Sequence, residues 1–218
     1  MKIGEIEIKW LGHSGFLIKN SKIIYIDPYG IKESEKADLI LITHGHHENC
    51  SIEDLSKIVK HGTKIIATAD CQSKINRLNS QIKMEIAEPK KELIFGDIKI
   101  SVFPAYNING NFHPKDEGWV GYLIKINDSL IYHSGDTDVI PEMKNLTGYK
   151  QLNKKFIALL SINGRFTMGA EEAIEVAKLI KPSVIIPMNY ENSEKKYVSE
   201  FVQLCNEEGI KAEILEKE

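Results

Sequence analysis

The chain has 218 residues, of which 42% are hydrophobic, with 28 Lys and Arg against 31 Asp and Glu and a formal net charge of −3. This length and composition suffice for a buried core and favour a single domain over residues 1–218. Proteins that grip nucleic acids or anionic membranes by charge are strongly basic, so we expect neither as a partner.

The cysteines and the first residues bear on the cellular compartment. Cys50, Cys71 and Cys205 lie far apart and form no CxxC pair, which speaks against a disulfide framework or a thiolate zinc site. The N-terminal residues 1–16 mix charged and apolar residues and lack the apolar region of a signal peptide. Because no apolar run approaches the about 20 residues that span a bilayer, we expect a cytoplasmic protein.

The first half of the chain predicts strands with two helices among them. Alternating or continuous apolar runs between turn residues indicate strands, and Ser51 with Asp54 three residues later indicates a helix start. In chain order, the predicted elements are a strand over 5–10, a hairpin over 15–27 turning at Asn20 and Ser21, a fully buried strand over 37–43, a helix from Ser51 to Gly62, a strand over 63–69, a short helix over 70–79, and strands over 83–88, 91–96 and 97–105.

The second half continues the same alternation of strands and helices. The predicted elements are a hairpin over 118–135 turning at Asn127 and Asp128, a strand over 156–162, a helix over 170–180, a strand over 183–188, a helix over 193–208 and a strand over 210–215. No Gly-, Ser- or Pro-rich linker separates the halves, so the pattern predicts one α/β domain.

The run LITHGHHENC, residues 41–50, contains the strongest chemical signal. His44 and His46 follow a predicted buried strand with Gly45 between them, and alternate residues at a strand end can direct two imidazoles into one space. Imidazole is a ligand for zinc, iron and other first-row divalent ions. The alternative is a polar loop whose histidines bind nothing. A second, weaker signal is Asp136 in HSGDTD, which could reach a site at the sheet edge or form an ordinary turn.

These segments and others resemble the metallo-β-lactamase superfamily, and most closely its small prokaryotic metal-dependent hydrolases, which include proteins like ascorbate-phosphate lactonase. The similarity runs from residue 10 to about residue 190, through WLGHSGFLI, IIYIDPYG, LITHGHHENCS, FPAYN, HPKDEGWVGY, IYHSGDTDVIPEM, TMGAEEA and IIPMNY. The resemblance implies an α/β (α+β) fold, a four-layer αβ/βα sandwich of two mixed sheets with helices outside. It also implies hydrolysis by water that one or two divalent ions activate.

The superfamily signature T-H-x-H-x-D-H reads THGHHEN in this chain, from Thr43 to Asn49. The resemblance implies that His44 and His46 bind the first metal and that Asp136 is the bridging carboxylate. The family's middle histidine has no counterpart in FPAYN, and His113 in FHPK is the nearest candidate.

Three departures from the family fall on the second metal. Glu48 replaces an aspartate, while Asn49 and Asn189 replace histidines. Amide oxygens bind zinc poorly and harder ions tolerably. We therefore expect at most one firmly bound divalent ion, of zinc, manganese or iron, and a second site that is lost or weakened.

The resulting hypothesis is a metal-dependent hydrolase of an ester, lactone or phosphoester, with Glu48 and Asp136 as catalytic residues. Glu48 would orient or deprotonate the attacking water. The alternative is a non-catalytic descendant that binds a ligand or partner through the amides of Asn49, Asn107 and Asn189. His13 either lines the cleft that would hold the substrate or ligand, or forms a hydrogen bond within a turn. We expect a small-molecule ligand or substrate, and the sequence does not set the oligomeric state.

Overall fold

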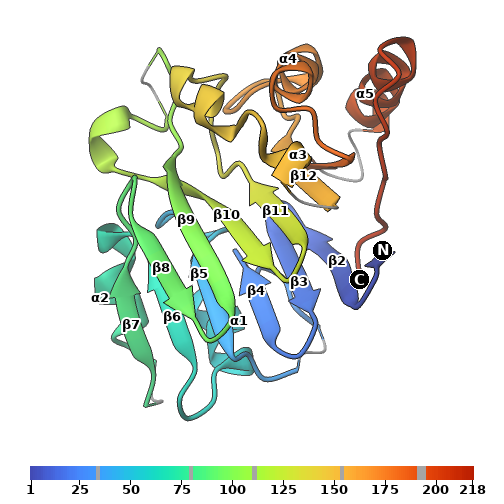
Figure 1. The fold of residues 1–218 in the computed structure, drawn as a ribbon. Helices are drawn as coiled ribbons and strands as arrows, with labels where there is room; N and C mark the ends of the chain where they lie inside the picture. Colours follow the sequence, from blue (N-terminus) through green and yellow to red (C-terminus); the bar gives the residue numbers. More distant parts are fainter. Residues whose placement is uncertain (33–34, 79–80, 110–111, 153–154, 191–194) are drawn as a thin grey trace. The chain divides into compact units, whose positions relative to one another are not determined.

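The chain divides into two units, each built on one β-sheet (Figure 1). The first unit comprises residues 1–87 and 215–218, and the second comprises residues 88–214. The computed structural model describes residues 1–218 except 33–34, 79–80, 110–111, 153–154 and 191–194. The expectation of a single domain over 1–218 stays a prediction.

The sheet of the first unit follows the order of the chain. Its strands are β1 (Lys2–Ile3), β2 (Ile6–Gly12), β3 (Gly15–Lys19), β4 (Ile23–Ile26), β5 (Leu39–Ile42), β6 (Lys64–Ala67) and β7 (Lys83–Ile86). Neighbours are antiparallel from β1 to β4 and parallel from β4 to β7. Parallel neighbours need crossover connections, and two of these carry α1 (Ile52–Ile58) and the pair η1 (Ala69–Cys71) and α2 (Gln72–Ile75).

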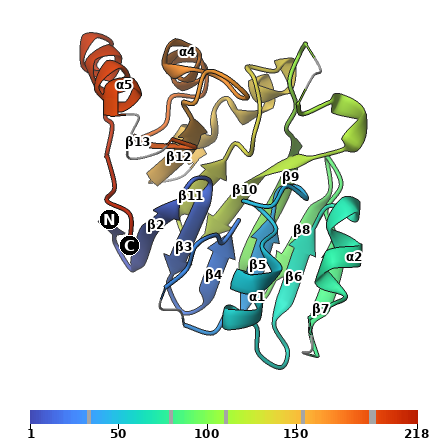
Figure 2. The same ribbon diagram turned by 180° about the vertical axis from the view of Figure 1, so that it is seen from behind.

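Figure 2 shows α1 and α2 on one face of this sheet. Leu55 and Ile58 of α1 and Ile75 of α2 share a buried cluster with Ile40 and Ile65 of the sheet. The strand β5 is fully buried at every residue, as its continuous apolar run predicted. Helices and strands in this unit therefore share one apolar core. The loop that follows β5 begins at a strand buried in that core.

The helix α1 begins as predicted and ends early. The Ser51 hydroxyl accepts the Asp54 N–H at 3.3 Å, which is an N-cap. The helix stops at Ile58, well before the predicted end at Gly62, because Val59 is extended and the Lys60 N–H donates to the Thr63 hydroxyl instead of continuing the helix.

The sheet of the second unit has the order β13-β12-β11-β10-β9-β8. Its strands are β8 (Glu92–Phe95), β9 (Ile98–Pro104), β10 (Val120–Ile126), β11 (Ser129–His133), β12 (Lys155–Ser161) and β13 (Val184–Met188). The strands β8 to β11 are antiparallel, and β11, β12 and β13 are parallel. The connections contain η2 (Lys115–Glu117), η3 (Pro141–Leu146), α3 (Tyr149–Leu152), α4 (Ala170–Ile180) and, after β13, α5 (Lys195–Glu207).

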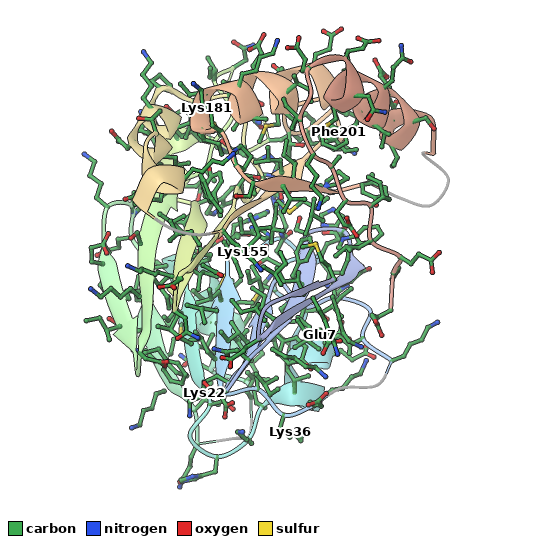
Figure 3. All side chains as sticks on the ribbon, turned by 45° about the vertical axis from the view of Figure 1, so that its right-hand side comes forward. Glu7, Lys22, Lys36, Lys155, Lys181 and Phe201 are labelled. Atoms are coloured by element: carbon green, nitrogen blue, oxygen red, sulfur yellow. The ribbon has the colours of Figure 1, made fainter. Side chains whose placement is uncertain are left out.

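The helices α4 and α5 lie side by side, and α4 also contacts β12 (Figure 1). Figure 3 labels Phe201 of α5, which is fully buried, and Lys181, which ends α4 in a left-handed conformation. Ala173, Ala177 and Ile180 of α4 are buried, so they form the face with which this helix packs.

Two further predicted segments differ from the structure. The strand predicted over 210–215 is wrong, because only Ala212 bridges to Ile185 and the rest forms no ladder. Its apolar residues stay partly exposed, with Ile214 at 41%. Burial of apolar side chains would therefore add little to the stability of a longer strand here. The short helix predicted over 70–79 ends at Ile75. Residues 193 and 194 of the predicted helix over 193–208 lie outside the described residues.

Within the described ranges, no helix combines the length and the apolar character needed to cross a membrane.

Candidate metal centre

A buried hydrogen-bond chain orients His44 in the first unit. Asp27, directly after β4, accepts the Thr43 N–H at 2.8 Å and the Thr43 hydroxyl hydrogen at 2.6 Å. The Thr43 Oγ1 lies 2.9 Å from His44 Nδ1. Because the hydroxyl hydrogen points at Asp27, the oxygen accepts a hydrogen from Nδ1, and His44 presents Nε2 as its ligand atom.

His44 and His46 meet at the distance that one ion would require. His44 Nε2 lies 3.0 Å from His46 Nδ1. Two nitrogens bound to one zinc ion at about 2.0–2.1 Å, with an angle of roughly 90–110° between them, lie about 2.9–3.4 Å apart. His44 is buried and His46 is exposed. The pair therefore fits a divalent ion reached from solvent.

The backbone between the two histidines is held by the segment that follows β6. The Asp70 carboxylate accepts the Gly45 N–H at 2.9 Å, and the Lys74 ammonium donates to the Gly45 carbonyl. A Cβ atom at position 45 would lie 2.5 Å from Asp70 Oδ2. Glycine leaves room here for the Asp70 carboxylate, and a larger residue would displace that side chain from the histidine loop.

Asn49, expected to face a ligand, is turned toward Asp27. Its Nδ2 donates to Asp27 Oδ2 at 2.9 Å and to Thr43 Oγ1 at 3.4 Å. Its Oδ1 is buried and has no hydrogen-bond partner among the described residues. These donors fix the amide orientation, so a neutral oxygen is what Asn49 could offer a cation. Glu48 is half-buried on the same loop, and His47 packs edge-on against Tyr29.

In the second unit, the structure brings His113 and Asp136 together. His113 Nε2 lies 3.5 Å from Asp136 Oδ2, and both side chains are buried. His113 Nδ1 lies 3.0 Å from Asn107 Oδ1 and 3.0 Å from the Phe166 carbonyl oxygen. Because both neighbours are acceptors, Nδ1 carries a hydrogen and Nε2 is the atom suited to a metal.

Asn107, expected to contact a ligand, supports His113. Its Oδ1 accepts the His113 N–H at 3.0 Å, and its Nδ2 donates to Asp138 Oδ1 at 2.8 Å and to the Phe166 carbonyl at 3.0 Å. Asn107 and His113 are thereby tied to two later segments of the unit. The polar groups of the Asn107 amide are all engaged in this scaffold.

The remaining predicted residues sit in strained or turn positions. Asp136 follows Gly135, whose φ is 65° and whose Cβ would lie 2.5 Å from the Val120 carbonyl oxygen. Asn189, directly after β13, is buried and also left-handed, with φ 62°. His13 lies in the β2–β3 turn, where Nδ1 is 3.2 Å from the Ser14 hydroxyl. A hydrogen bond from Trp10 to the His13 carbonyl closes this turn.

Sequence reasoning missed the residues that orient the histidines. Asp27 belongs to the IIYIDPYG segment, which carried the family resemblance without a role for its carboxylate. Asp138 follows Asp136 in the same polar turn. For Asp27, the position of an acidic residue directly after a buried strand could have indicated this role. A buried carboxylate needs hydrogen-bond donors from neighbouring segments.

Comparison with known proteins identifies the family. Residues 7–189 match the beta-lactamase superfamily domain. A UPF0173 metal-dependent hydrolase of Thermococcus kodakarensis is 34% identical over 195 residues, covering 85% of this chain and 84% of that protein. One from Nanoarchaeum equitans is 32% identical over 221 residues and covers 98% of both.

A solved structure from Parabacteroides distasonis superimposes with a TM-score of 0.84 at 26% identity, over 98% of this chain and 94% of that one. Two mixed sheets with few helices match this neighbour, which confirms the expected fold class. The chain belongs to the metallo-β-lactamase superfamily, in its branch of small metal-dependent hydrolases.

Proposed function

We propose that this protein hydrolyses an ester, lactone or phosphoester with one divalent ion, of zinc, manganese or iron. The proposed ligands are His44 and His46 of the first unit and His113 and Asp136 of the second, the set that the family resemblance assigns. The observation that carries the proposal is the 3.0 Å separation of His44 Nε2 and His46 Nδ1, which matches the distance between two nitrogens bound to one ion. Thr43 orients the His44 ring so that its Nε2 is free of hydrogen.

A bound divalent ion would lower the pKa of water to about 7 and so supply hydroxide near neutral pH. The protein's own part is to hold the ligand rings. Asp27 and Thr43 present Nε2 of His44, and Asn107 with the Phe166 carbonyl presents Nε2 of His113. Glu48, half-buried on the same loop as His44 and His46, is the proposed group that orients the attacking water or accepts its proton.

The second metal site is proposed to be weakened. The Asn49 nitrogen is committed to Asp27, which leaves one neutral oxygen where the family has an imidazole. Glu48 is one methylene longer than the family's aspartate, so its carboxylate would sit differently. Neutral oxygen ligands bind zinc and manganese more weakly than imidazole and carboxylate do.

Native mass spectrometry of protein purified without added metal or chelator tests the proposed ligands. We expect one transition-metal ion per chain in the wild type, and its loss in both His46→Ala and His113→Ala. The control is His61→Ala, which removes an exposed histidine outside the proposed set. A wild type that binds no zinc, manganese or iron would overturn the proposal and favour the non-catalytic binder. Retention of the ion by His113→Ala would remove His113 from the ligand set.

A triple variant tests the weakened second site. Glu48→Asp, Asn49→His and Asn189→His together should raise the ion count by about one, because imidazole and a shorter carboxylate replace weak ligands. Histidine is among the residues that adopt left-handed backbone more readily, so position 189 can accept it. An unchanged count in a folded triple variant would show that these replacements are not the cause of the deficit.

We also propose a cytoplasmic location and a small-molecule substrate. All three cysteines are buried as free thiols, a state that a reducing compartment preserves. Fractionation of the native host cells would test the location.

A further inference from the structure

Two loops of the second unit hold an aromatic pair that is partly exposed. Phe112 is 54% exposed, and its ring centroid lies 4.6 Å from that of Phe166, edge to face. Large aromatic side chains that remain in water gain little for the fold. A single exposed apolar residue such as Ile94 on β8 needs no explanation, but a packed pair held at the surface is unusual.

The backbone of Phe166 is held in place by polar contacts, most of them partly buried. The Phe166 carbonyl accepts hydrogen bonds from Asn107 Nδ2 and from His113 Nδ1, each at 3.0 Å. The Asn163 side-chain oxygen accepts the N–H groups of Arg165 and Phe166 at 3.1 and 3.2 Å. A ligand that met the Phe166 ring would therefore find its backbone already ordered, which lowers the entropic cost of binding.

A positive charge lies on the same surface. The Arg165 guanidinium carbon is 4.7 Å from the centre of the Phe166 ring. Arg165 is exposed, and no carboxylate pairs with it among the residues that the structure describes. A guanidinium beside an aromatic face suits a planar group that carries a carboxylate or phosphate.

The position of the pair relates it to the proposed chemistry. Phe112 precedes His113 in the chain, and His113 Nδ1 bonds to the carbonyl of Phe166 itself. A flat group against the two rings would lie beside the histidine that we propose as a metal ligand. Ligand sites combine apolar walls with a few placed polar groups, and this surface has both.

We propose that Phe112, Phe166 and Arg165, named here the aromatic subsite, bind a flat apolar part of a negatively charged substrate. This inference rests on the proposed function for its link to catalysis. It narrows the substrate to esters, lactones or phosphoesters that carry an aromatic or similarly planar group and a separate anionic group.

Binding to metal-free protein tests the aromatic subsite without any turnover. The probe is 2-naphthoate, titrated by NMR into chelator-treated full-length protein, with 2-naphthylmethanol as a neutral probe of the same shape. We expect Phe112→Ala to weaken naphthoate binding about tenfold, and Arg165→Gln to weaken naphthoate about tenfold with naphthylmethanol nearly unchanged. Ile94→Ala is the matched control, since it removes a similarly exposed apolar side chain from β8, and should bind both probes like the wild type.

The outcomes separate the subsite from the proposed function. Failure of the wild type to bind naphthoate at millimolar concentration, or equal losses in Phe112→Ala and Ile94→Ala, would overturn the subsite. If naphthoate binding depends on Phe112 and Arg165, but the wild type takes up no zinc, manganese or iron in the metal-binding test, the subsite is supported and the hydrolase proposal is contradicted. In an active protein, Phe112→Ala should raise KM for a naphthyl ester and leave KM for an ethyl ester unchanged.

Discussion

The Asp27 carboxylate connects the end of β4 to the histidine loop after β5. It accepts from the Thr43 amide, the Thr43 hydroxyl and the Asn49 side chain, in a fully buried place. A buried carboxylate is tolerated only where such donors surround it. The same donors decide the state of His44, because the Thr43 hydroxyl can accept from Nδ1 only while it donates to Asp27.

Thr43→Val removes the hydroxyl and keeps the branched shape. We expect it to lower the free energy of unfolding by about 1–3 kcal/mol, since Asp27 loses a buried donor. We also expect metal affinity to fall about 10–100-fold, because the ring of His44 loses the partner that orients it. Urea unfolding and metal titration measure the two effects.

Thr147→Val is the matched control, since the Thr147 hydroxyl donates to the Lys144 carbonyl on an exposed turn. This variant should change stability by no more than about 0.5 kcal/mol. Equal metal affinity in Thr43→Val and the wild type would show that His44 needs no orientation from Thr43.

The Asp54 side chain is one of the links that tie the helix α1 to the loop before β5. Asp54 accepts the N–H groups of Gly30 and Ile31 at 2.9 and 3.0 Å and a hydrogen bond from the Ser51 hydroxyl at 2.7 Å. Lys57 also donates to it at 3.0 Å. Burial alone raises the pKa of this carboxyl, but the donors outweigh burial and the pKa is lowered.

Asp54→Asn should lower the free energy of unfolding by about 2–3 kcal/mol near neutral pH, because an NH2 group then faces buried N–H donors. A carboxyl whose pKa is lowered by folding stabilises the protein above its unfolded pKa of about 3.9, and this contribution is lost as the pH falls through the folded value. The difference between variant and wild type should therefore shrink below about pH 4. Urea unfolding across pH 2.5–7 is the measurement.

Glu53→Gln controls for the loss of a charge on α1. Glu53 pairs with the same Lys57 at 3.2 Å, but its side chain is 83% exposed, so this variant should lose less than about 1 kcal/mol. If both variants lost the same amount, the contacts of Asp54 with Gly30 and Ile31 would not be what stabilises α1.

The turn after β11 requires glycine for two reasons that can be separated. Gly135 has φ 65° and no room for a Cβ, whereas Gly96, in the β8–β9 turn, has φ 62° with nothing within 4 Å of its Cβ position. Gly96→Ala should cost about 1 kcal/mol from backbone strain alone. Gly135→Ala should cost roughly 1–3 kcal/mol more from the contact with Val120, and should weaken metal binding by displacing Asp136. Equal losses of stability in the two variants would show that the backbone around Val120 yields without cost.

For the whole protein, the proposed one-ion site predicts a pattern of substrates. In a one-ion site, no second ion stabilises the negative charge that develops on the oxygen of the leaving group. This stabilisation matters most for poor leaving groups. We expect measurable hydrolysis of 4-nitrophenyl acetate and little of a dialkyl phosphodiester, and each ~1.4 kcal/mol of lost stabilisation lowers the rate about tenfold. His46→Ala measures contaminating activity. Efficient turnover of the phosphodiester that disappears in His46→Ala would show that a working second site exists.

The outline of the fold was accessible from local patterns. The hairpin of β3 and β4, the buried strand β5 and the capped start of α1 were predicted from periodicity, apolar runs and Ser51, because these features act over a few neighbouring residues. The segment over 210–215 alternates like a strand and forms only one bridge. A strand exists only if a neighbour pairs along its length, and no local pattern contains that neighbour.

The sequence by itself determined that His44 and His46 follow a buried strand, and its resemblance to the family implies that Glu48, Asn49 and Asn189 stand at positions of second-metal ligands. Only the tertiary structure decided which groups the amides of Asn49 and Asn107 contact. Asn49 bonds to Asp27 and Asn107 supports His113, although both were expected to face a ligand. An amide can donate and accept in any direction, so its role follows from the groups that folding brings within about 3 Å of it.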